Sequence, residues 1–264
     1  MAEQEDQRQQ LPAGLGHHQA AEQRGCPQGR LDGDRPATRS CRACCRTRPS
    51  PADALIPPNF PDAYTPGVCT ACTYNPDEAK RLAQQAGLTP GTEVKLQYNT
   101  GAGHEEWTAA VKQQLEQNLG LKVTYTGVPF RDLLDNEQQP EASGLWRAAW
   151  SADYPTPGNY LFPLLATQSI VVPTASPSEP AQGDNRGRYS NPEFDKLLAQ
   201  AAQTQDEAAR NDLYKRAEKI AIGDDLALIP LWFRQQSRLV NTEKFGNVNM
   251  DFSEDPTFDT ITLK

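Results

Sequence analysis

The stretch that decides the fold is VKLQYNTGAGHEEWTAAVKQQLEQNLGLKVTY, residues 94–125. Apolar and polar side chains alternate over residues 94–98, which predicts a β-strand. Apolar residues then recur every four positions from Trp107 to Leu119, which predicts a helix over about residues 103–119 that ends at Gly120. Alternation returns at Val123 and Tyr125. Strand, helix and strand at this spacing predict a βαβ unit with two parallel strands, so the fold class is α/β.

Helix-start signals lie on both sides of this unit. Asn75-Pro76-Asp77-Glu78 combines a capping side chain, a first-turn proline and acidic residues at the positive end of the helix dipole. Asn191-Pro192-Glu193 repeats that pattern before another apolar stripe. The remaining predicted elements are a proline-rich connector over 55–61, a helix over 131–136, a buried strand over 145–152, a surface loop over 174–190, a helix over 206–222, and strands over 226–233 and 237–240.

The first fifty residues differ from the rest in composition. Residues 1–55 contain no Ile, Val, Phe, Tyr, Trp or Lys. Such a segment cannot bury enough apolar surface to offset the entropy cost of ordering it. Enrichment in Arg, Ala, Gly, Pro and Cys is typical of a GC-rich gene read out of frame. We therefore interpret residues 1–50 as a disordered or out-of-frame, non-native segment, with order beginning near Leu55.

Charge and hydropathy exclude two classes of partner. The formal net charge is -8, which argues against nucleic acid, and the arginines of the first fifty residues are interleaved with acidic ones. No apolar run approaches the roughly 18 residues of a membrane span. The first ten residues, MAEQEDQRQQ, are acidic and amide-rich, so they do not form an export signal.

The cysteines allow two interpretations. Two C-x-x-C pairs, Cys41/Cys44 and Cys69/Cys72, have the spacing of a zinc ribbon. A local disulfide between Cys69 and Cys72 is the alternative if the protein is exported, because disulfides persist outside the cytoplasm. We expect no metal and no cofactor.

One segment concentrates residues suited to ligand binding. Trp146, Arg147, Trp150, Asp153 and Tyr154 lie within ten residues, next to a proline-rich turn. A carboxylate accepts hydrogen bonds from an ammonium group, a guanidinium clamps a carboxylate, and aromatic rings offer flat apolar walls. Together they suit a zwitterion such as a short peptide. A core strand that ends in a structural Asp–Arg ion pair is the alternative.

From about Pro51 onward the chain resembles the family 5 extracellular solute-binding proteins, which include oligopeptide and dipeptide receptors. Four stretches carry the resemblance in the same order and spacing. They are LIPPNFPDAY with YNPDEAKRLAQQAG, then RAAWSADYPTPGNYL, then YSNPEFDKLLAQAAQT, and finally RNDLYKRAEKIAIGDDLALIPLWF.

The resemblance implies roles for single residues and for whole regions. Asp153 matches the aspartate that holds the amino terminus of the ligand, Arg147 matches an arginine that binds its carboxylate, and Trp150 matches an aromatic near the pocket wall. It also implies a type II periplasmic-binding-protein fold, truncated at the N-terminus. Residues 51–222 correspond to the second lobe, and residues 223–264 correspond to strands that return to the first lobe.

The expected function follows from that resemblance. The chain is expected to capture short peptides for an ABC importer, outside the cytoplasm, with the permease subunits as partners. Membrane contact would come only through the permease or a missing lipid anchor. The alternatives are a non-functional truncated receptor and a zinc-ribbon interaction protein.

We do not expect an enzyme. The chain contains no G-x-S-x-G, P-loop or H-E-x-x-H motif. His104 opens a helix without a nucleophile motif beside it, so we interpret it as a solvated first-turn residue.

Overall fold

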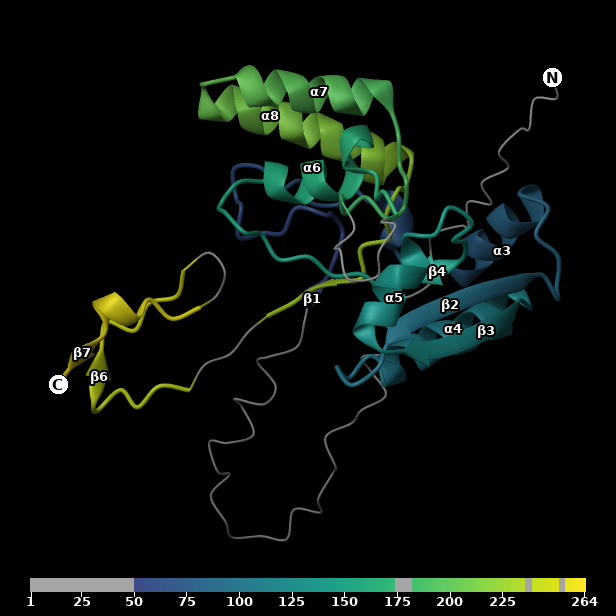
Figure 1. Ribbon diagram of the computed structural model, residues 1–264, viewed down its shortest axis with the longest axis horizontal. Helices are drawn as coiled ribbons and strands as arrows, with labels where there is room; N and C mark the ends of the chain where they lie inside the picture. The colour runs from purple at the N-terminus through teal and green to yellow at the C-terminus, as the bar shows by residue number, and fades with distance from the viewer. Residues whose placement is uncertain (1–49, 174–181, 236–238, 252–254) are drawn as a thin grey trace, which may run out of the picture.

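The computed structural model describes residues 50–173, 182–235, 239–251 and 255–264 (Figure 1). Helices α6, α7 and α8 lie together on one side of this structure, and a small sheet with α3 and α4 lies on the other. The hairpin of β6 and β7 lies apart from both groups. The two main groups have separate hydrophobic cores.

The sheet confirms the predicted βαβ unit. Strands β2 (Glu93–Asn99), β3 (Lys122–Val128) and β4 (Leu145–Trp146) are parallel in the order β3-β2-β4. Helix α4 (Glu105–Leu119) connects β2 to β3 and ends at Gly120, whose φ of 67° is left-handed. This conformation is accessible to glycine without a steric cost.

Helix α3 (Pro76–Gln85) begins at the predicted cap. The Asn75 side chain accepts a hydrogen bond from the Glu78 backbone N–H. The helix contributes Ala79 and Ala83 to the core under the sheet. Alternate residues of β2 and the apolar stripe of α4 complete that core, so it forms from the periodicities that predicted the elements.

The second core lies among α6 (Gly158–Leu165), α7 (Pro192–Gln203) and α8 (Glu207–Glu218). Phe194 of α7 belongs to this core and is 0 % exposed. A π-helical turn (Lys219–Asp224) extends α8, so the predicted helix over 206–222 is present, but its last turn widens. The connector over 55–61 packs against this core through Ile56.

Several short elements complete the chain. Strand β1 (Ser50–Pro51) pairs antiparallel with β5 (Trp232–Phe233), and β6 (Phe245–Gly246) pairs with β7 (Thr262–Leu263). The others are η1 (Thr70–Cys72), η2 (Thr167–Ser169), η4 (Phe258–Thr260) and α5 (Phe130–Glu137). Helix α5 contains the predicted helix over 131–136.

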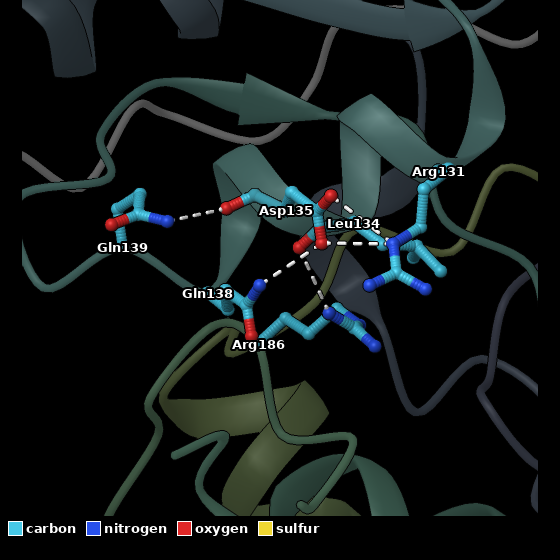
Figure 2. A network of polar contacts seen from close by, with 6 residues as sticks. All are labelled: Arg131, Leu134, Asp135, Gln138, Gln139 and Arg186. Atoms are coloured by element: carbon cyan, nitrogen blue, oxygen red, sulfur yellow. Dashed lines mark hydrogen bonds and ion pairs between the residues drawn. The ribbon is translucent and has the colours of Figure 1, made fainter. Parts of the chain in front are cut away.

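Polar contacts join α5 of the sheet group to the turn over 182–190 (Figure 2). The Asp135 carboxylate accepts hydrogen bonds from the Arg131 Nε and the Gln138 Nε2. Arg186 donates to the Leu134 carbonyl at 3.4 Å and forms an ion pair with Glu137, also at 3.4 Å. The Asp135 contacts lie within α5 and its C-cap, whereas the two Arg186 contacts connect α5 to the turn, whose Tyr189 belongs to the helical core.

The predicted buried strand over 145–152 is wrong beyond its second residue. Only Leu145 and Trp146 pair with β2, at Leu96 and Gln97. Ala148 and Ala149 are exposed in irregular backbone. Alanine buries little surface and favours strands weakly, so nothing holds this stretch in the sheet.

The predicted C-terminal strands are also wrong. Of residues 226–233, only Trp232 and Phe233 form a strand. Residues 226–228 use their apolar side chains to pack against the helical core, and Leu226 has a φ of 48° that bends the chain out of an extended path. Leu239 and Val240 lie in no strand, and residues 236–238 lie outside the described residues.

The predicted surface loop over 174–190 is only partly described. Residues 174–181 lie outside the described residues. In the remainder, Asn185 is fully buried and its amide bonds to the carbonyls of Ala166 and Tyr189. Residues 182, 184, 187 and 190 are exposed, so the described part is a surface turn, as predicted, and the buried Asn185 amide anchors it to the structure.

Cys69 and Cys72 form a disulfide, as the export alternative predicted. Paired sulfurs supply no thiolate for zinc, and the described residues contain no cluster of three metal-ligating side chains. The other cysteines, and the interpretation of residues 1–49, lie outside the described residues. Within the described ranges, no helix is long and apolar enough to cross a membrane.

Candidate ligand-binding site

The candidate site lies where the parallel strands end. Arg147 directly follows β4, and its backbone N–H donates to the Gln97 carbonyl at 2.9 Å, which continues the pairing by one residue. The chain then leaves the sheet as an irregular segment that reaches α6 at Gly158. Ligands of open α/β sheets bind outside the carboxyl ends of the strands, so this segment has the expected place in the fold.

The Arg147 side chain is half-buried and lies in the field of a buried acid. Burial lowers the pKa of Arg147, and the charge of Glu137 opposes this effect. Glu137 is 5 % exposed, and burial raises its pKa to about 7 against the fields of Arg186 and Arg147. Glu137 therefore carries its negative charge only in part near neutral pH, and Arg147 as a whole residue remains partly exposed.

His104 lies within the electrostatic range of Arg147 and belongs to a cluster of aromatic rings. The Trp107 indole N–H donates to Nδ1 of His104 at 3.1 Å, and the Trp107 ring meets Trp232 edge to face at 4.9 Å. Burial and the charge of Arg147 lower the pKa of His104. The interpretation of His104 as a solvated residue is therefore wrong, because it is half-buried and accepts a hydrogen bond.

Trp150 and Asp153 are held by one buried side chain. Oδ1 of Asn159 accepts hydrogen bonds from the Trp150 indole N–H at 3.2 Å and from the Asp153 backbone N–H at 2.9 Å. Asn159 is 2 % exposed, whereas Asp153 is exposed in a bend. The Asp153 side chain is therefore available to a ligand, and it lies in a bend outside any strand.

The last two candidate residues, Tyr154 and Trp146, take no part in these hydrogen bonds. Tyr154 is 50 % exposed beside Asp153. Trp146 lines a polar cavity of about 200 Å³ together with Lys95, Gln97 and Glu141. In the described part of the chain, no hydrogen bond or ion pair joins Arg147 to Asp153. The structural ion pair proposed as the alternative is therefore not formed.

Sequence reasoning missed two residues of this region. Glu137 and Asn159 both contact or influence the predicted ones. Asn159 follows Pro-Gly, which is a turn signal, and nothing local shows that its side chain is buried. Glu137 lies in a polar stretch, and only the fold brings it within electrostatic range of Arg147.

The arrangement suits recognition of opposite charges. An exposed carboxylate, an indole and a partly exposed guanidinium lie on one connected segment, and they are held by separate backbone and side-chain contacts. A carboxylate binds ammonium groups, and a guanidinium binds carboxylates. The described residues provide no nucleophile positioned by a base at this place.

The chain is similar in sequence to a family of known binding proteins. Residues 42–170 match the model of the bacterial extracellular solute-binding proteins, family 5, middle region. The periplasmic oligopeptide-binding protein OppA of Salmonella typhimurium is 31% identical over 177 residues, which cover 66% of this chain and 30% of that protein. The chain thus spans about a third of the length of the curated relatives it matches.

Solved structures show the same fold. The murein tripeptide binding protein MppA of Escherichia coli matches with a TM-score of 0.56 and 26% identity, over 71% of this chain and 34% of that one. OppA of Burkholderia pseudomallei matches with a TM-score of 0.63 and 24% identity, over 82% of this chain and 41% of that one. The type II binding-protein fold expected from the sequence is confirmed for the part that these matches cover.

Proposed function

Since the chain belongs, through residues 42–170, to the family 5 bacterial extracellular solute-binding proteins, we propose that it captures short peptides for an ABC importer. The observation that carries the proposal is the exposed Asp153, held with Trp150 by Asn159 on the segment between β4 and α6. In this proposal Asp153 binds the amino terminus of the peptide and Arg147 its carboxylate. Trp150, Tyr154 and Trp146 offer the aromatic surface.

Two kinds of observation support the proposal. Relatives that match this chain are named as oligopeptide-binding and murein peptide-binding proteins. The Cys69–Cys72 disulfide is consistent with a location outside the cytoplasm, where such bonds persist. We propose that the permease subunits are the protein partners, and that the role is binding without catalysis.

The proposal includes the organisation of the chain. Residues 51–222 form the second lobe of the binding fold, and residues 223–264 return toward the first lobe. The separation of the β6–β7 hairpin from both cores supports this division.

The test compares blocked and free peptides. Trialanine, N-acetyl-trialanine and trialanine amide are titrated into the full chain and followed by NMR chemical shifts. Because Asp153 is exposed, each charged contact contributes at most about 1 kcal/mol, or about fivefold in affinity. We expect dissociation constants near or above about 1 mM.

The substitutions identify which terminus each residue binds. Asp153→Asn should weaken trialanine about fivefold and leave N-acetyl-trialanine unchanged, because the acetyl group removes the ammonium. Arg147→Met should weaken trialanine by a similar factor and leave the amide unchanged. If trialanine causes no shifts at Trp150, or if both substitutions weaken blocked and free peptides equally, the proposed roles are refuted.

A further inference from the structure

The side chain of Asn159 links helix α6 to the Trp150 ring and to the Asp153 backbone. It belongs to the first turn of α6, it is 2 % exposed, and both hydrogen bonds to its Oδ1 come from the segment before the helix. A carbonyl oxygen has two lone pairs, so the indole of Trp150 and the backbone of Asp153 together occupy it fully. If this buried oxygen is removed, both donors lose a fixed acceptor inside the structure.

The start of α6 is itself fixed by close packing. A Cβ added to Gly158 would lie 2.7 Å from the hydroxyl oxygen of Tyr214, in α8. Glycine therefore lets the first turn of α6 pack directly against the Tyr214 hydroxyl, and a larger residue here would force the helix start or the Tyr214 ring to shift. The position of Asn159 follows from this contact, since it is the next residue in the same turn.

The segment between β4 and α6 has few other restraints. Ala148, Ala149 and Ser151 are exposed, and Asp153 lies in a bend. Without the Asn159 oxygen, the indole of Trp150 and the backbone of Asp153 would lose the contacts that fix them relative to each other.

We propose that Asn159 is the positioning residue that holds the Asp153 backbone and the Trp150 ring in the geometry used for ligand binding. Its role in binding rests on the proposed function, whereas its role in holding the segment does not. Asn159 acts through its acceptor oxygen and does not itself contact the ligand.

The first measurement needs no ligand. Hydrogen exchange of the Trp150 indole N–H and the Asp153 backbone N–H is measured by NMR in the full chain. Asn159→Leu should accelerate both by about three- to tenfold, which corresponds to the loss of one hydrogen bond each. Asn159→Asp keeps the acceptor and should stay within about twofold of the unmodified chain. Gln168→Leu, at an exposed position, is the matched control.

A second variant covers the case in which Asn159→Leu does not fold. Gly158→Ala displaces the start of α6 from Tyr214 while leaving the Asn159 amide intact. Both N–H signals should then shift and exchange faster together. The inference is overturned if neither substitution changes the two exchange rates, or if Asn159→Asp accelerates them as much as Asn159→Leu.

The ligand measurement separates positioning from general stability. Asn159→Leu should weaken trialanine by about fivefold, and it should cause no further loss when Asp153→Asn is already present, since both act on one contact. Full additivity of the two losses would refute positioning. If the unmodified chain does not respond to trialanine, the proposed function fails, and the exchange rates still decide the role of Asn159.

Discussion

Glu218, at the end of α8, is a buried acid whose protonation should control stability. It is 0 % exposed, and its Oε1 accepts the backbone N–H groups of Leu55 and Ile56, both at 2.7 Å. Burial raises the pKa of Glu218 from 4.5 to about 7, although these two hydrogen bonds lower it. Glu218 thus anchors the connector to the helical core, and its contribution to the free energy of unfolding depends on pH.

The sign of the pH dependence follows from that raised pKa. The folded state binds the proton of Glu218 more tightly than the unfolded state, so the contribution to stability is complete below about pH 4.5. It is lost as the pH rises through about 7. Each pKa unit corresponds to about 1.4 kcal/mol, so the change from 4.5 to about 7 corresponds to about 3–4 kcal/mol at most.

The substitution Glu218→Gln should remove this dependence. Glutamine keeps an acceptor for the two backbone groups and carries no charge at any pH. We expect the unfolding free energies of the two chains to be similar near pH 4.5, and the variant to be more stable by up to about 3 kcal/mol near pH 8. Urea denaturation at several pH values measures this difference.

The control is Glu207→Gln, an exposed acid in the first turn of α8. It should change the unfolding free energy by no more than about 0.5 kcal/mol at every pH. If Glu218→Gln and the unmodified chain show parallel curves from about pH 5 to 8, the carboxyl is not raised by burial and the reasoning fails.

Three further predictions concern stability. Phe194→Ala should lower the free energy of unfolding by about 3–5 kcal/mol, because the ring is 0 % exposed. Phe162→Ala, at a residue that is 42 % exposed, should lower it far less. Equal losses in urea denaturation would contradict this prediction. Asn191→Ala removes the oxygen that caps α7 and should cost about 1 kcal/mol, seen as a lower Tm, and an unchanged Tm would show that the cap is dispensable. Replacing Cys69 and Cys72 by Ser should cost no more than about 2–3 kcal/mol, since the disulfide closes a short loop; a chain that does not fold after reduction would refute this estimate.

The candidate site was predictable in its residue types and unpredictable in its geometry. Exposed Asp153 and half-buried Trp150 lie in the segment that the sequence indicated. The predicted regular strand would have put Arg147 and Asp153 on one face by alternation. The segment instead leaves the sheet after Trp146, so alternation does not apply to it.

The sequence by itself determined the elements whose signals are local. The βαβ unit, the Asn75 and Asn191 caps and the stop at Gly120 were all confirmed, because each depends on residues within a few positions of one another. Only the tertiary structure decided which long-range partners the ambiguous segments find. The Asn159 oxygen holds the segment after β4, and the helical core takes up residues 226–228 that would otherwise suit a strand. An apolar side chain is expected to be buried, but the residues that it packs against depend on contacts between segments far apart in the chain.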